Sequence, residues 1–207
     1  MSLTSVLLKP AQDKQVELDT KKKILGAVMD ISTFNTPEEI LNLYKARVKS
    51  VVVDIEGEII ATDEKGNPLI AEKVNAQKNH KIDREERLYP IYMILNESDP
   101  NVVEAYVFPM FGLGLWDWIS GYVALESDLN TVKGVAFDHK GETPGLGARI
   151  TEEKVRNRYK ENKKIFSDAG NLESITMVKG EGITGLSMHE VDGLSGATIT
   201  AKGVNKM

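Results

Sequence analysis

Residues 119–138 read ISGYVALESDLNTVKGVAFD, and this stretch decides the fold class. Two runs rich in branched and aromatic residues, 119–126 and 132–138, flank a break of Ser, Asp and Asn, a pattern typical of two strands joined by a turn. Two similar runs, 89–95 and 102–108, precede them. Because the strands are short and follow one another directly, the sequence predicts an antiparallel meander.

Helical patterns stand on both sides of this meander. Residues 13–30 carry apolar side chains at helical spacing, and the stretch TPEE at 36–39 begins a second helix that runs to about Val48. A polar helix is expected over 151–162, capped by Thr151, and a terminal helix from Ala197 onward. The fold class is therefore predicted to be α+β, an antiparallel sheet flanked by helices.

The remaining segments give weaker signals. Residues 51–55 and 58–62 flank Glu56-Gly57 and predict a hairpin, and residues 174–178 predict a further strand, whereas residues 72–87 receive no assignment. We expect one compact unit, made of an N-terminal helical segment at 1–48 and an α+β domain at 49–207.

Composition excludes several classes of protein. The 207 residues carry a net charge of −5 with both signs interspersed, so no basic surface for nucleic acid is indicated. The absence of cysteine rules out disulfides and cysteine-ligated metal centres, and no run of about 18 apolar residues is present. His139 and Glu142 form the nearest approach to a metal pair, and no metal site is predicted.

The stretch Asp192–Thr200, DGLSGATIT, allows two interpretations. In the structural one, Gly196 relaxes a turn and Ser195 or Thr198 caps the helix, whose apolar side begins at Ile199. In the functional one, a hydroxyl at a helix start lies where a phosphate joined to Thr198 is stabilised. The three histidines are scattered and build no catalytic triad, so Thr198 is not predicted to be a nucleophile and no catalytic residue is assigned.

Three motifs together resemble the FMN-binding domain of the C subunit of the sodium-translocating NADH:quinone oxidoreductase. They are DGLSGAT at 192–198, GLGLWD at 112–117 and HKGETPGLG at 139–147. The resemblance implies FMN attached through a phosphoester to Thr198 by a separate flavin transferase that uses FAD, with Ser195, Gly196 and Ala197 completing the attachment motif.

The same resemblance implies which residues contact the flavin ring. It places Thr143 and Leu146 against the isoalloxazine, Glu142 and Gly145 in the same loop, and Trp116 beside the site. Read without it, residues 142–147 are a glycine and proline turn, and Trp116 serves packing in an aromatic hairpin. A dinucleotide-binding loop is excluded, because Asp117 stands where GxGxxG requires its third glycine.

The family implies an electron carrier rather than a self-contained enzyme. Its partners would be the other subunits of an oxidoreductase that couples NADH oxidation and quinone reduction to sodium export, and the flavin transferase. The stretch LKPAQ at 8–12 resembles the segment after the membrane anchor in that family, which implies a bacterial inner-membrane location on the periplasmic side. The alternatives are the G subunit of an Rnf-type complex, and a non-redox interaction module with Thr198 unmodified.

Overall fold

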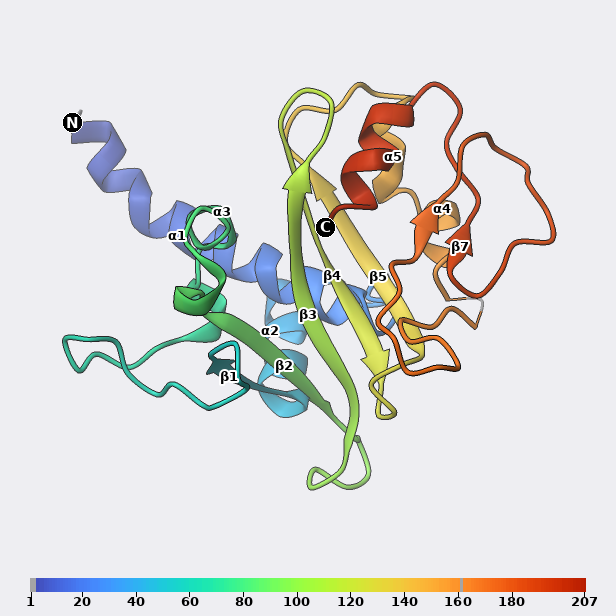
Figure 1. Cartoon of the computed structure of the whole chain (residues 1–207). Coiled ribbons are helices and arrows are strands. Elements are labelled where there is room, and N and C mark those ends of the chain that lie inside the picture. The colour runs from blue at the N-terminus through green and yellow to red at the C-terminus, as the bar shows by residue number, and fades with distance from the viewer. Residues whose placement is uncertain (1–2, 161) are drawn as a thin grey trace.

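A five-stranded antiparallel sheet forms the centre of the computed structural model, which describes residues 3–160 and 162–207 (Figure 1). The strands pair in chain order, so the predicted meander is confirmed. They are β1 (Val48–Val53), β2 (Tyr89–Leu95), β3 (Val103–Leu113), β4 (Trp118–Glu126) and β5 (Val132–His139). The α+β fold class is confirmed as well.

Alternating side chains divide the sheet into two buried faces. In β3, Ala105 and Val107 point into a core shared with the N-terminal helices, while Phe108 and Met110 pack against the C-terminal segments. In β4, Ala124 and Leu125 separate in the same way. The sheet is thus the middle layer between the N-terminal helices and the C-terminal third of the chain (Figure 1).

The first face is covered by α1 (Leu3–Gly26) and α2 (Pro37–Arg47). Helix α1 extends further toward the N-terminus than predicted and ends before Asp30, and its Leu25 is completely buried. Helix α2 begins as predicted, because Thr36 and Glu39 form a reciprocal capping box and Pro37 occupies the first turn. Residues 1 and 2 of the expected N-terminal segment lie outside the described residues, and the division at residue 48 stays a prediction.

The hairpin predicted at 51–62 is confirmed only at its turn: the chain reverses at Glu56-Gly57, with an antiparallel bridge from Val53 to Ile59 and a backbone hydrogen bond from Ile60 to Val52. The predicted second strand is wrong, because β1 pairs along its length with β2 and residues 58–62 form no strand. The Asp54 carboxylate accepts hydrogen bonds from the backbone N–H groups of Glu56 and Glu58, which folds this segment into a loop. Ile59 is 68% exposed, so no core holds a second strand here.

Short turns of helix replace regular structure between β1 and β2. The unassigned segment contains η1 (Ala71–Lys73), α3 (Ala76–Asn79) and η2 (Arg84–Glu86). Among the described helices, none combines the length and the apolar character needed to cross a membrane.

The second face is covered by short elements joined by long loops. They are η3 (Gly147–Thr151), α4 (Glu153–Asn157), β6 (Thr176–Met177), β7 (Glu190–Val191) and α5 (Thr198–Val204). The helix predicted over 151–162 is present but shorter, as α4 ends at Asn157; residue 161 of the predicted range lies outside the described residues. The predicted cap is wrong, because the Thr151 hydroxyl donates to the Ala148 carbonyl. The strand predicted at 174–178 shortens to β6, whose parallel partner β7 was not predicted.

Candidate cofactor site

The loop at 192–197 joins β7 to α5 and is fixed by polar contacts. The Asp192 carboxylate accepts hydrogen bonds from the backbone N–H groups of Gly182 and Ile183, both 2.9 Å long. Burial opposes ionisation of Asp192, but these hydrogen bonds, together with the charge of Arg158, lower the pKa of the carboxyl group. Arg158 donates to the carbonyl oxygens of Asp192 and Gly193 at 2.9 and 2.6 Å. These contacts therefore hold Asp192 and Gly193, the first residues of the motif DGLSGAT, in place.

Glu181 connects this loop to two arginines. Its carboxylate accepts a bidentate pair of hydrogen bonds from Arg149, 3.0 and 2.6 Å long, and a third from Arg158 at 3.2 Å. It also accepts from the backbone N–H of Ser195 at 3.3 Å. The hydrogen bonds from Arg149 and Ser195 lower the pKa of Glu181 to about 2. Sequence reasoning missed this network because its members are far apart in the chain.

Two threonines in the motif face opposite environments. Thr198 is exposed at the first residue of α5, whereas Thr200 is buried with 1% of its surface accessible. The capping prediction is wrong, since the residue before α5 is Ala197 and no side chain bonds to the start of the helix. Ile199 is 54% exposed, so the apolar side of α5 does not begin there.

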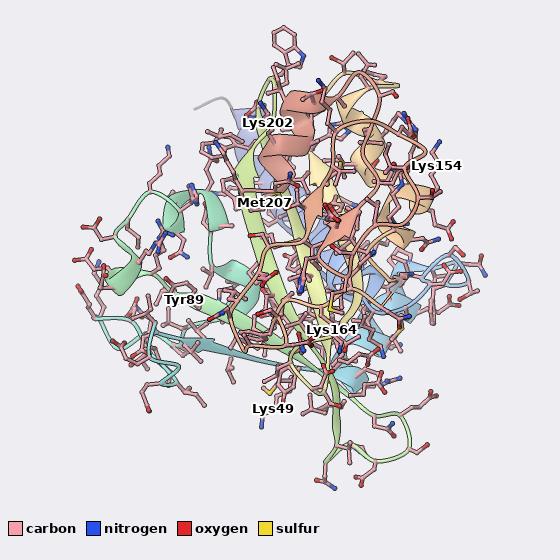
Figure 2. The ribbon with its side chains drawn as sticks, turned by 45° about the vertical axis from the view of Figure 1, so that its right-hand side comes forward. Lys49, Tyr89, Lys154, Lys164, Lys202 and Met207 are labelled. Atoms are coloured by element: carbon pink, nitrogen blue, oxygen red, sulfur yellow. The ribbon has the colours of Figure 1, made fainter. Side chains whose placement is uncertain are left out.

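Helix α5 is held against the end of β3, which brings the attachment motif beside the β3–β4 hairpin. Buried Ala201 and Val204 pack in the core of the second face. Figure 2 shows Lys202 and Met207 along this end of the chain, and Met207 lies against Gly112 of β3. Thr198 is therefore fixed relative to the hairpin.

A pocket of about 260 Å³ opens beside Thr198. Three segments that are far apart in the sequence build it: the β3–β4 hairpin, the loop at 142–147 and the start of α5. Its lining residues are Leu115, Glu142, Thr143, Leu146, Gly147, Gly196, Ala197, Thr198, Ile199 and Thr200. Leu146 packs over Gly196, so the motifs HKGETPGLG and DGLSGAT touch each other.

Glu142 is the buried acidic group of this pocket. It is 4% exposed, and its carboxylate accepts hydrogen bonds from the Thr200 hydroxyl at 2.5 Å and the Trp116 backbone N–H at 3.0 Å. A Cβ atom at Gly114 or Gly147 would collide with one of its oxygens. Glycine is therefore required at both positions to make room for the carboxylate.

The remaining predicted residues lie next to the pocket rather than in its wall. Trp116 is 69% exposed, and its indole N–H donates to the Thr143 hydroxyl at 3.1 Å. Gly145 has a φ of +75°, which turns the loop toward Leu146. Ser195 is exposed, and its backbone N–H donates to Glu181 of the neighbouring arginine network.

Four pocket residues were not predicted to bind the cofactor: Leu115, Gly147, Ile199 and Thr200. Leu115 and Gly147 lie inside motifs that drew attention, so proximity in sequence could have identified them. Ile199 and Thr200 close the stretch DGLSGATIT, so proximity applies to them too, but the contact of Thr200 with Glu142, 58 residues away, could not be foreseen from the sequence.

A larger groove of about 1120 Å³ runs between α1 and the strands β2 to β4, lined by residues that include Lys14, His80, Tyr92 and Phe111. It contains none of the predicted site residues, so size alone does not identify the cofactor site. Within residues 3–160 and 162–207, no group of three His, Asp or Glu side chains is placed to hold a metal ion.

The smaller pocket suits a flavin phosphate ester in its chemistry. Leu115, Leu146 and Ile199 offer apolar surface for a flat ring, Thr143 and Glu142 offer polar groups, and Thr198 places a free hydroxyl at the rim. Glycines at 145 and 196 with positive φ keep both loops tightly turned around the opening. The residues present therefore fit the cofactor that the motifs predict.

Comparison with known protein families places this site in a defined class. A family model described as FMN-binding domain matches residues 114–207, which contain the whole pocket. The C-terminal part of the chain is an FMN-binding domain.

Relatives along nearly the whole chain identify the family. The chain is 32% identical to the C subunit of the Na(+)-translocating NADH-quinone reductase of Pseudomonas aeruginosa, over 98% of this chain and 81% of that protein. It is 33% identical to the same subunit in Haemophilus ducreyi, over 97% and 78%. The chain belongs to the family formed by the C subunit of the Na(+)-translocating NADH-quinone reductase.

Solved structures agree with this assignment. The crystal structure of the C subunit of this reductase from Parabacteroides distasonis superposes with a TM-score of 0.77 at 32% identity, covering 100% of this chain and 92% of that one. The structure described as NqrC of Shewanella oneidensis gives a TM-score of 0.74 at 26% identity, covering 93% and 89%.

Proposed function

We propose that the chain carries FMN covalently on Thr198 and transfers electrons within a sodium-translocating NADH:quinone oxidoreductase. The observation that carries the proposal is the contrast within the motif: Thr198 presents a free hydroxyl at the rim of the pocket, while the residues around it are anchored. A transferase can reach Thr198 without unfolding the domain.

Attachment is a phosphoryl transfer with a simple balance. The Thr198 oxygen bonds to the FMN phosphorus of FAD, the pyrophosphate bond of FAD breaks, AMP leaves and the hydroxyl proton is released. The chain gains the mass of FMN minus water. Among the described residues that line the pocket, the one possible base is the Glu142 carboxylate, and its two oxygens accept hydrogen bonds from Thr200 and Trp116 rather than from Thr198, which supports catalysis by the separate transferase.

Once attached, the flavin would supply the redox chemistry, and the protein would supply position and electrostatic environment. A covalent link suits a carrier because the cofactor cannot dissociate between electron donor and acceptor. The partners are the other subunits of the complex, as the family name implies. We place the chain at the bacterial inner membrane, on the extracytoplasmic side, held by an anchor in the full-length protein; this placement rests on the resemblance alone.

The two alternatives are separated by different observations. The match to relatives of the C-subunit family over 98% of the chain favours that family over an Rnf-type G subunit. The non-redox interaction module would keep the same fold with Thr198 unmodified. Only a measurement of attached FMN therefore separates this alternative from the proposed function.

The test is the intact mass of the chain after co-expression with a flavin transferase. Wild type should gain one FMN minus water, mapped to the peptide with Thr198, and Thr198→Ala should gain nothing. Thr184→Ala removes another exposed threonine and should load like wild type. Loading of Thr198→Ala, or failure of wild type with a transferase proven on another acceptor, would contradict the proposal.

A further inference from the structure

Glu142 is a buried carboxylate without a cationic partner. Only 4% of its surface is exposed, and among the described residues no Lys, Arg or His nitrogen lies within 4.0 Å of its oxygens. Burying a charge in this way is costly, and proteins ordinarily pair such groups. Glu181, the more accessible acid of the neighbouring network, has two arginines. The contrast marks Glu142 as a group retained for something other than stability.

The position of this carboxylate is rigidly defined. The Thr200 hydroxyl bonds to one oxygen and the Trp116 backbone N–H to the other, and two glycines leave space that no other residue would leave. The hydrogen bond between Thr200 and Glu142 thereby joins the loop at 142–147 to α5, and both residues line the same pocket. The charge is fixed in the wall that the cofactor would contact.

We propose that Glu142 lowers the midpoint potential of the flavin held in this pocket, with Thr200 as its positioning residue. The inference rests on the proposed function. Each electron that the flavin accepts from the donor centre of the complex adds one negative charge to the pocket, unless a proton accompanies it. A fixed carboxylate opposes this added charge, and the opposition is strong where water is excluded. The oxidised form is therefore favoured and the carrier becomes a stronger reductant.

The experiment is an equilibrium redox titration of the flavinylated 207-residue chain. Glu142→Gln keeps the shape and removes the charge, and we expect its midpoint potential to shift to a more positive value than that of wild type. Glu142→Asp, which keeps the charge, should shift less. The matched control is Glu153→Gln, which removes the same charge from an exposed position on α4 and should leave the potential unchanged. A shift in Glu142→Gln no larger than that in Glu153→Gln overturns the inference.

Thr200 is tested by a variant pair. Thr200→Val removes the donor to Glu142 and should move the potential away from the wild-type value, whereas Thr200→Ser keeps the donor and should restore it. A purely structural role for Thr200 would lower the melting temperature of Thr200→Val and leave the potential of the loaded protein unchanged, which would overturn its positioning role.

The attachment of FMN is measured first by intact mass, so that failure of the proposed function can be told apart from failure of the inference. Wild type without attached FMN defeats the proposed function and the inference together; loaded variants with the wild-type potential defeat the inference alone. If Glu142→Gln does not fold, the double variant Glu142→Leu/Thr200→Val removes the charge and its buried donor together. Its potential should also be more positive, and an unchanged value overturns the inference.

Discussion

The two faces of the sheet both bury an apolar core, but they are covered by different kinds of structure. On the face covered by α1 and α2, regular elements bury alternating apolar side chains, among them Ile24, Leu25 and Ile94 with no exposed surface. On the other face, short elements and long loops bury a second apolar core, and a network of Arg149, Arg158, Glu181 and Asp192 ties the loops together in addition. The difference teaches that the first face is a platform, and that the second face carries the pocket because irregular backbone can bring three distant segments together.

The largest effect is expected from a core truncation on the helix-covered face. Ile94→Ala removes a completely buried side chain and should lower the free energy of unfolding by about 2–5 kcal/mol. Ile199→Ala makes the same change at the pocket rim, where the side chain is 54% exposed, and should cost no more than about 0.5 kcal/mol. Denaturant unfolding of both variants measures the difference. Equal losses in the free energy of unfolding would contradict the contrast between the helix-covered face and the pocket.

An intermediate effect is expected inside the pocket. Thr200→Val leaves the buried Glu142 carboxylate without one of its two donors, and should lower the free energy of unfolding by about 1–3 kcal/mol. Thr198→Val changes an exposed threonine two residues away and should change it by less than about 0.5 kcal/mol. Unfolding of the unmodified chains measures both values. Equal costs would show that the two threonines do not have the separate roles assigned to them.

The smallest effect concerns Glu181 and pH. Its pKa in the folded chain is lowered from 4.5 to about 2, so the folded state favours the ionised carboxylate. Its contribution to stability is present above pH 4.5 and is lost as the pH falls toward 2. The melting temperature of wild type should therefore exceed that of Glu181→Gln above pH 4.5, with the difference shrinking below it. A difference independent of pH would mean that Glu181 does not act through its charge.

The sheet and the first helices could be predicted because their signals are local. The runs of branched and aromatic residues within 119–138 predict strands β4 and β5, and the reciprocal cap of Thr36 and Glu39 needs only neighbouring residues. The second strand of the hairpin at 51–62 failed for the opposite reason, since β1 pairs with a strand about 40 residues further along the chain and residues 58–62 have no core to cover.

The candidate site was predictable in its motifs but not in its construction. Resemblance pointed to Thr198, Thr143 and Leu146, and the structure gathers all three around one pocket. The contact of Glu142 with Thr200, and those of Glu181 with its arginines, join residues 23 to 58 positions apart. No periodicity or capping rule reports such pairs, so only the folded chain reveals which acid is paired and which is not.

The most direct test of the central claim is a crystal structure of the chain after loading by a flavin transferase. We predict electron density continuous from the Thr198 oxygen through a phosphate to a ring seated between Leu115, Leu146 and Ile199. A ring in the larger groove beneath α1, or a phosphate joined to any other residue, would contradict it.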